Sequence, residues 1–249
     1  MHHLTILSKE DTPRDEYEAR EMKKWPYCEL VGTLVWISLI SWPDISFITS
    51  YLSQYSTNPG RTHWYAAQQV LRYLSGTCDL TLRLGSNEED PAILITYVDS
   101  DWGRNIDDRQ LFSGFVFLLG SSAILWSTKK QPTIVTSSTE GEYMALSWGI
   151  WHGLWFHQFL GDISLDQGDI PTLILMDNMG AIELTKDAQH RQLTKHIDVT
   201  YHFLRQYVTT RTFDVMHCPS REMLADGLTK PIDGVPFNVM VDGLGLVQV

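Results

Sequence analysis

Apolar side chains recur at helical spacing in the first third of the chain. Leu30, Val31 and Leu34 belong to one such pattern, and a second begins at Ile45 with steps of three and four residues. Trp42-Pro43-Asp44 separates them, because a proline disfavours the helical conformation in the residue before it. The pattern predicts a small helical module with helices over residues 27–38, 45–55 and 62–76.

Beyond residue 80 the apolar and polar positions begin to alternate. A short strand is expected at 80–84, and residues 85–91 combine turn formers with an acidic run, as linkers do. The next predicted elements are strands at 92–98, 113–119 and 122–127, a long helix at 138–159, a strand at 172–176, helices at 178–186 and 194–208, a strand at 213–217 and a short helix from Ser220. This order predicts an α/β fold with a mixed five-stranded sheet covered by helices on both faces.

These patterns divide the chain into four segments. Residues 1–25 are polar, rich in charge and without periodicity, so we interpret them as a flexible lead-in. The helical module occupies residues 26–85 and the mixed-sheet domain residues 91–232. The remaining residues, 233–249, are interpreted as a C-terminal tail.

The composition is that of an ordinary folded, soluble protein. Of the 249 residues, 43% are hydrophobic and 20% are charged. No uncharged apolar run reaches the roughly 18 residues of a membrane-spanning helix, and the N-terminus lacks the pattern of a secretory signal, so no membrane partner is expected. The cysteines, Cys28, Cys78 and Cys218, are odd in number and far apart, which favours a reducing compartment over a disulfide framework.

The net charge argues against a nucleic-acid ligand. The chain carries a formal charge of −11 at pH 7, from 30 acidic and 19 basic residues. Non-specific binding to nucleic acid usually needs a basic surface. A site that holds metal ions through carboxylates adds negative formal charge, which weakens this objection without removing it.

Several carboxylates lie where predicted elements begin or end. Asp99 follows the first strand of the sheet and Asp177 follows the strand at 172–176. Because the ends of neighbouring central strands are close in space, these two groups could be adjacent, and two such carboxylates repel unless a cation lies between them. Glu142 lies in the first turns of the long helix and Asp226 in the short terminal helix. A pocket of such carboxylates can hold two Mg²⁺ ions about 4 Å apart.

Each of these residues also has an ordinary structural explanation. An aspartate at the end of a strand is more often a turn or cap residue. Glu142 can favour the dipole of its helix, and Asp226 can be a solvated helix residue. The spacing alone therefore leaves both interpretations open.

Several short sequence blocks, taken in their order along the chain, are more specific evidence of function than the spacing of the carboxylates. They resemble, in the same order, the ribonuclease H domain of copia-type retrotransposon Pol polyproteins. The blocks are Tyr97–Trp102 (YVDSDW), Ser113–Phe117 (SGFVF), Trp126–Pro132 (WSTKKQP), Ser137–Leu146 (SSTEGEYMAL), Asp177–Ile182 (DNMGAI), Thr194–Asp198 (TKHID) and Leu224–Pro231 (LADGLTKP). Upstream, residues 27–32, 42–45 and 63–77 are similar to the end of the reverse transcriptase region of the same polyprotein, so the helical module would be a thumb- or connection-like remnant.

The resemblance implies a ribonuclease H-like fold that cuts the RNA strand of an RNA–DNA hybrid with two divalent metal ions. By position, the metal-binding carboxylates of the family look like Asp99, Glu142, Asp177 and Asp226. Glu140 and Glu142 are about 200° apart around a helix, so only one can face the strands. In this family the glutamate followed by an aromatic residue and a small apolar run faces inward, which selects Glu142. We interpret Asp101 as a turn or supporting residue.

A hybrid duplex would be recognised by its 2′-hydroxyl groups and its minor-groove shape, through polar side chains and a few cations. The candidates for this contact are Lys129, Lys130, Asn178, Arg191, Lys195, His196 and Lys230. Any one of the cations is more often a solvated surface charge. Asn178 is explained at least as well as the cap of the following helix.

The long helix is unusually aromatic. Trp148, Trp151 and Trp155 fall on one of its faces at spacings of three and four residues. We expect them to fill the core between helix and sheet rather than to stack on bases. The alternative is that an exposed aromatic residue on this helix marks a contact with polymerase domains.

The hypothesis is an Mg²⁺-dependent ribonuclease H without a small-molecule cofactor, in which Mn²⁺ can substitute. Its expected partners are an RNA–DNA hybrid and the remainder of a Pol polyprotein, and no DNA synthesis is expected from the chain alone. The expected location is intracellular, in the cytoplasm, in retrotransposon particles or in the nucleus. The competing hypothesis is a catalytically inactive remnant that only binds nucleic acid or a protein. A DNA exonuclease or transposase of similar architecture fits less well, because exonucleases of this architecture commonly carry Asp-x-Glu where this chain has Asp99-Ser100-Asp101.

Overall fold

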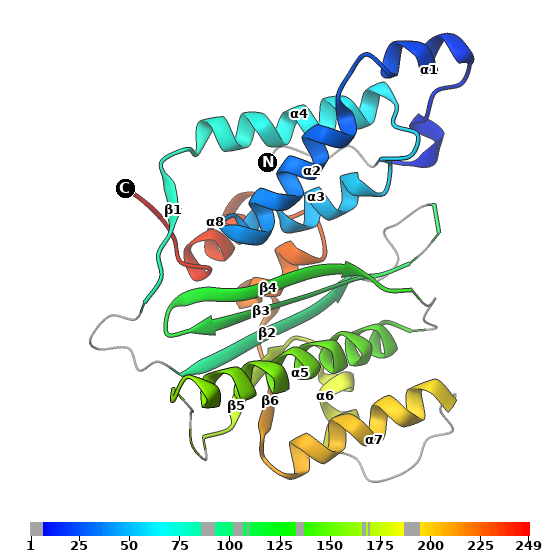
Figure 1. Cartoon of the computed structure of the whole chain (residues 1–249). Coiled ribbons are helices and arrows are strands. Elements are labelled where there is room, and N and C mark those ends of the chain that lie inside the picture. Colours follow the sequence, from blue (N-terminus) through cyan, green and yellow to red (C-terminus); the bar gives the residue numbers. More distant parts are fainter. Residues whose placement is uncertain are drawn as a thin grey trace.

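A computed structural model of the chain describes residues 7–85, 93–101, 107–108, 110–132, 137–165, 168, 170–186 and 195–249, with the backbone only for 195–201. Helices cover both faces of one central sheet (Figure 1). Within the described residues, no helix combines the length and the hydropathy needed to cross a bilayer.

The central sheet has the predicted five strands. They are β2 (Leu94–Asp101), β3 (Phe112–Leu119), β4 (Ser122–Lys130), β5 (Thr172–Met176) and β6 (Phe213–His217), in the spatial order β4-β3-β2-β5-β6. The hairpin strands β2, β3 and β4 pair antiparallel, whereas β5 lies parallel to both β2 and β6. The predicted mixed sheet is confirmed. The first strand extends to Asp101, three residues beyond its predicted end.

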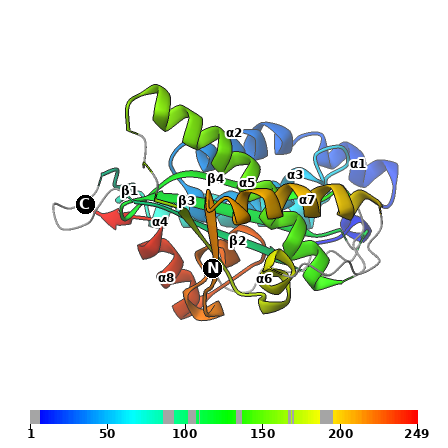
Figure 2. The same cartoon turned by 90° about the horizontal axis from the view of Figure 1, so that it is seen from below.

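One face of the sheet is covered by the long helix α5 (Ser138–Asp162), together with α6 (Met179–Lys186) and α7 (Lys195–Thr209) (Figures 1 and 2). Two glycines let α5 approach the strands closely. A Cβ atom at Gly149 would lie 2.9 Å from Cγ2 of Val98, and one at Gly153 would lie 2.7 Å from the ring of Phe213. Such distances are shorter than carbon atoms tolerate, so these positions require glycine although it is a poor helix former.

The prediction that the tryptophans of α5 fill the core is wrong. The side that faces the sheet carries Leu146, Gly149, Ile150, Gly153 and Phe156, all of which are buried. Trp151 and Trp155 lie on the other side, with exposed fractions of 61% and 57%. Trp148 is half-buried between them and the sheet, where its ring contacts Phe115 edge-on.

The helical module covers the opposite face of the sheet. It comprises α2 (Tyr27–Ile40), α3 (Ser46–Ser53) and α4 (Arg61–Gly76), which share a core of their own. Trp126 of β4 donates a hydrogen bond of 2.7 Å from Nε1 to the carbonyl oxygen of Ser38. The rings of Phe47 and of Phe112 in β3 pack edge to face, with their centroids 5.3 Å apart. The module is therefore docked on the sheet through buried contacts.

Regular structure extends into both segments that were expected to lack it. In the lead-in, a short 3-10 helix η1 (Lys9–Asp11) is followed by α1 (Glu16–Met22), whose N-cap Asp15 accepts a hydrogen bond from the Glu18 N–H. In the predicted tail, α8 (Gly234–Gly243) is followed by β7 (Leu246–Gln248), which pairs with β1 (Leu80–Leu82). These elements are too short for a clear apolar period. Most of the predicted linker, residues 86–91, lies outside the described residues.

Candidate active site

Two of the predicted carboxylates lie on neighbouring parallel strands. Asp99 lies within β2, where it is opposite Gly114 of β3, and Asp177 directly follows the last residue of β5. Because β2 and β5 run parallel, their carboxyl ends meet at the same edge of the sheet. Asp99 is almost fully buried, with 2% of its surface exposed.

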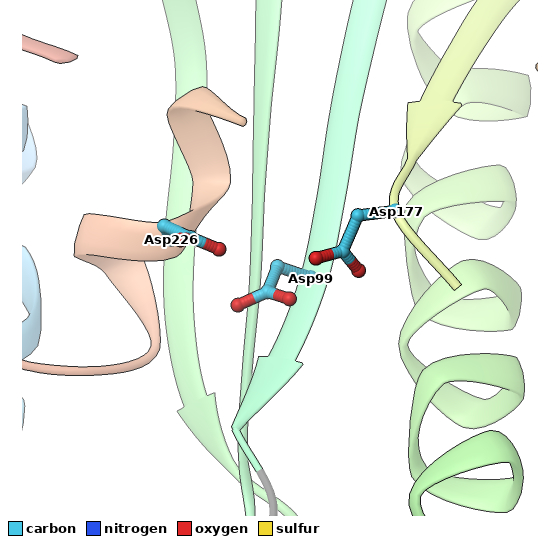
Figure 3. Close-up of side chains that lie close together, drawn as sticks. All are labelled: Asp99, Asp177 and Asp226. Carbon is cyan, nitrogen blue, oxygen red and sulfur yellow. The ribbon is translucent and has the colours of Figure 1, made fainter. Parts of the chain in front are cut away.

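The third carboxylate comes from the end of the chain. Asp226 lies in the 3-10 helix η4 (Leu224–Leu228), which crosses β3 at Gly114. A Cβ atom at Gly114 would lie 2.7 Å from Cβ of Leu228, so only glycine lets η4 lie this close to the strand. Side-chain oxygens of Asp99, Asp177 and Asp226 all lie within 4.8 Å of one another (Figure 3).

Glu142, in the first turns of α5, is not part of the group whose oxygens lie within 4.8 Å of one another, but the charges of Asp99 and Asp177 act on it. It is 5% exposed, whereas Glu140, two residues earlier, is only partly buried. Burial raises the pKa of Glu142, and the charges of Asp99 and Asp177 raise it further, against a hydrogen bond from the backbone of Ser100. Oε2 of Glu142 has no hydrogen-bond partner among the described residues. Glu142 therefore carries an unpaired buried oxygen and interacts electrostatically with the aspartates.

The aspartates are held by hydroxyl donors. Thr229 donates a short hydrogen bond to Oδ2 of Asp99, and Ser220 donates one of 2.8 Å to Oδ2 of Asp177. Burial raises the pKa of Asp99, and the carboxylates of Asp226 and Asp177 add to the rise, while Lys230 and Thr229 oppose it. The same balance applies to Asp226, whose pKa is raised by burial and by nearby carboxylates against the ion pair with Lys230.

Lys230 is the counter-charge of the site. Its Nζ lies 2.8 Å from Oδ1 of Asp226 and 3.8 Å from Oδ2 of Asp99. Although burial acts to lower it, the pKa of Lys230 is raised by the charges of Asp99 and Asp226. The residue was expected to contact a nucleic-acid backbone, but the structure places it among the carboxylates.

The donor set fits a hard divalent cation. Clustered carboxylate oxygens of this kind are the preferred ligands of Mg²⁺ and Mn²⁺. Asp99, Asp177 and Asp226 offer such oxygens at mutual distances that one ion can bridge, and Oε2 of Glu142 is a free acceptor beside them. Burial is the largest cause of the raised pKa values of Asp99, Asp226 and Glu142, and neighbouring carboxylates add to the rise.

The residues predicted to contact nucleic acid differ in their surroundings in the structure. Lys129 is exposed, with Nζ 5.7 Å from the centre of the Trp148 ring. Lys130 instead forms an ion pair of 2.6 Å with Asp108. The side chain of Asn178 accepts a hydrogen bond from the Ala181 N–H, so it caps α6. The remaining candidates lie outside the described side chains; these are Arg191, Lys195 and His196.

The sequence interpretation missed the residues that support the aspartates. Thr229 follows Asp226 by three residues within the block LADGLTKP, which was its only signal, and Ser220 had none. Asp101 lies in β2 two residues beyond Asp99, so both side chains share one face of the strand. Its charge contributes to the raised pKa of Asp226, which agrees with a supporting position beside the site.

No protein-family model matches the chain. Among relatives, the Retrovirus-related Pol polyprotein from transposon TNT 1-94 of Nicotiana tabacum is 34% identical over 240 residues, and the one from transposon RE2 of Arabidopsis thaliana is 35% identical over 223 residues. These matches cover 96% and 90% of this chain but only 18% and 15% of the relatives, so the chain spans less than a fifth of their length. A shorter relative, Secreted RxLR effector protein 161 of Plasmopara viticola, is 38% identical over 134 residues, which are 54% of this chain and 93% of that protein.

Solved structures of ribonucleases H also match. The ribonuclease H1 of Halobacterium salinarum is 16% identical, and the match covers 55% of this chain and 93% of that one with a TM-score of 0.39. The five-stranded mixed sheet has the α/β architecture that the sequence predicted. The Pol relatives, which match nearly the whole sequence, show that the chain belongs to the copia-type retrotransposon Pol polyproteins and corresponds to a segment of them.

Proposed function

We propose that the protein is a ribonuclease H that hydrolyses the RNA strand of RNA–DNA hybrids with two divalent metal ions, Mg²⁺ or Mn²⁺. The observation that carries this proposal is the convergence of Asp99, Asp177 and Asp226, whose oxygens lie within 4.8 Å of one another, with Glu142 buried beside them. These residues come from a strand, a strand end, a 3-10 helix and a long helix. Packing alone gives no reason to bring four carboxylates together, because their mutual repulsion destabilises the fold.

In this proposal Asp99, Glu142, Asp177 and Asp226 hold the ions. A pair of bound Mg²⁺ ions supplies water activation and stabilisation of the leaving oxygen in phosphodiester cleavage. The chain itself fixes the positions of the carboxylates. Thr229 orients Asp99 and Ser220 orients Asp177 through hydrogen bonds, which is how supporting donors keep metal ligands in place.

Fewer of the residues expected to contact the nucleic acid lie within the described part of the structure. We propose that Lys129, which is exposed on β4, contacts the phosphate backbone of the hybrid. Lys195 and His196 belong to this proposal through their sequence block TKHID. Lys130 is left out of it, since contact with nucleic acid would have to break its ion pair with Asp108.

The setting of this activity is a further part of the proposal. Residues 26–85 would be the end of a reverse transcriptase region, and the substrate would reach the nuclease from the remainder of a Pol polyprotein. The segment alone is not proposed to synthesise DNA. An intracellular location follows from this proposal, because reverse transcription of a retrotransposon takes place inside the cell.

The test is cleavage of an RNA–DNA hybrid with labelled RNA, compared with a DNA duplex of the same sequence. We expect Mg²⁺-dependent cleavage of the hybrid only. Asp177→Asn is expected to reduce the rate by more than about 100-fold, since losing even a supporting partner of a metal ligand costs about 10- to 100-fold. The matched control is Asp214→Asn, at an exposed aspartate of β6, which should keep the wild-type rate.

Two results would contradict the proposal. Equal cleavage rates of wild type and Asp177→Asn would show that the carboxylates take no part in the reaction. Hybrid binding without cleavage in Mg²⁺ and in Mn²⁺ would instead support the competing hypothesis of an inactive binding module.

A further inference from the structure

A cavity lies against α5, the helix that carries Glu142. It measures about 210 Å³ and lies between the N-terminal half of α5 and the ends of β3 and β4. The lining residues that matter here are Ser113, Lys129, Gln131, Met144, Trp148 and Trp151. Drug-sized ligands occupy about 300–1,000 Å³, so this cavity suits a smaller group.

Gln131 gives the cavity a polar wall. It is 7% exposed, and its Nε2 donates hydrogen bonds to Oγ of Ser113 at 2.6 Å and to the carbonyl oxygen of Gly141 at 3.1 Å. These two bonds fix the orientation of the amide. Oε1 is thereby left as an acceptor, and among the described residues it has no partner. This oxygen has almost no accessible surface, so the cavity is lined by other atoms of Gln131.

The opposite wall is aromatic and carries a cation. Trp151 stacks on Phe203 of α7 at 5.1 Å with an interplanar angle of 18°, yet 61% of its surface is exposed. Nζ of Lys129 lies 5.7 Å from the centre of the Trp148 ring. A flat π surface and a positive charge at one cavity match two parts of a nucleotide, which are the base face and the phosphate.

We propose that this cavity receives a base of a nucleic-acid strand, which stacks on Trp151, while Lys129 contacts the adjoining phosphate. Gly141, which accepts a hydrogen bond from Gln131, directly precedes Glu142 in α5. The inference rests on the proposed function for the identity of the strand. It extends that function by a base-binding position outside the carboxylates.

The experiment measures binding of single-stranded DNA to the full chain in EDTA, where cleavage cannot interfere. The probes are a labelled oligodeoxycytidylate and a strand of equal length made of abasic residues. Trp151→Ala is expected to weaken binding of the oligodeoxycytidylate by about fivefold or more. The matched control is Trp155→Ala, because Trp155 is 57% exposed on the same helix and also stacks, on Phe159, but does not line the cavity. The Trp155→Ala variant should bind the oligodeoxycytidylate with an affinity within about twofold of wild type.

Two further binding measurements make the test more specific. The abasic strand should bind wild type more weakly and should not respond to Trp151→Ala. Lys129→Ala should reduce the slope of log K against log salt by about 0.7, the value for one phosphate contact on a single strand. Equal affinities for the two strands, or equal effects of Trp151→Ala and Trp155→Ala, would overturn the proposal. The latter result would leave the exposed tryptophans as a surface for polymerase domains.

The failure of this inference can be distinguished from failure of the nuclease. If the cavity binds no base, Trp151→Ala should still cleave hybrids at the wild-type rate under saturating substrate. If the chain is no nuclease, cleavage is absent while the effect of Trp151→Ala on DNA binding remains.

Discussion

Nζ of Lys230 lies 2.8 Å from Oδ1 of Asp226, four residues earlier in the chain. The same ammonium group is 3.8 Å from Oδ2 of Asp99. Lys230 therefore supplies, without any ion, part of the positive charge that the cluster of carboxylates requires. A divalent cation and Lys230 would stabilise the same negative charges, so their effects on stability should depend on each other.

Lys230→Met tests this dependence. In EDTA the variant should lose about 1–3 kcal/mol of unfolding free energy, because two largely buried carboxylates lose their nearest cation. In saturating Mg²⁺ the loss should be smaller, since the metal ion replaces the missing charge. Urea unfolding in both conditions measures the two values. Lys23→Met, at an exposed lysine, is the control and should change neither. An equal loss with and without Mg²⁺ would show that Lys230 and the ion act on different groups.

The pKa shifts predict how stability depends on pH. The folded-state pKa values of Glu142 and Asp99 are raised, chiefly by burial, so the folded protein holds these protons at pH values where the unfolded chain has lost them. Without divalent ions, stability should therefore fall between about pH 4 and the folded-state pKa of each group, which is about 6 for Asp99 and about 10 for Glu142, by up to about 1.4 kcal/mol per pH unit for each proton. Metal binding requires the deprotonated form, so the stabilisation by Mg²⁺ should increase with pH.

Thermal unfolding between pH 5 and pH 8, with Mg²⁺ or with EDTA, measures this effect. Burial raises the pKa of Asp44 to about 6, but Asp44 lies in the helical module and should contribute equally in both conditions. The difference between the two melting temperatures therefore isolates the carboxylate site. It should widen with pH in the wild type and much less in Glu142→Gln. A difference that is constant over this range would contradict the assignment of Glu142 and Asp99 to an ion site.

Two glycines of α5 provide a matched pair for the packing of helix on sheet. Gly153→Ala should lower the unfolding free energy by about 1–3 kcal/mol, because the new Cβ would overlap the ring of Phe213. Gly161→Ala, in the same helix, meets no atom within 4 Å and should raise the unfolding free energy by about 0.5–1 kcal/mol. Urea unfolding of both variants measures the difference. Stabilisation by both alanines would mean that α5 lies farther from the sheet than described.

Much of the sheet could be predicted because its strands have strong local signals. The strands at 172–176 and 213–217 have the predicted bounds, since short apolar runs between turn residues identify buried strands. The orientation of α5 could not be predicted in this way. The periodicity of Trp148, Trp151 and Trp155 identifies a face, but it does not say that the glycine-bearing side packs on the sheet.

The candidate site shows the same limit. Neighbouring parallel strands explain why Asp99 and Asp177 meet, and this could be inferred from their places at strand ends. Asp226 reaches them only because Gly114 lets η4 lie against β3, a contact between residues far apart in sequence. No local sequence pattern predicts a contact of this kind. The choice of Glu142 over Glu140 came from the family resemblance, and the structure has Glu142 as the buried one of the two.

The central claim is that four carboxylates form one divalent-cation site, and isothermal titration calorimetry with Mg²⁺ tests it most directly. The wild type should bind Mg²⁺, and both Asp99→Asn and Asp177→Asn should weaken this binding by at least about tenfold, because each removes a negative ligand. Asp214→Asn should bind as the wild type does. Wild-type affinity in both Asp99→Asn and Asp177→Asn would contradict the account.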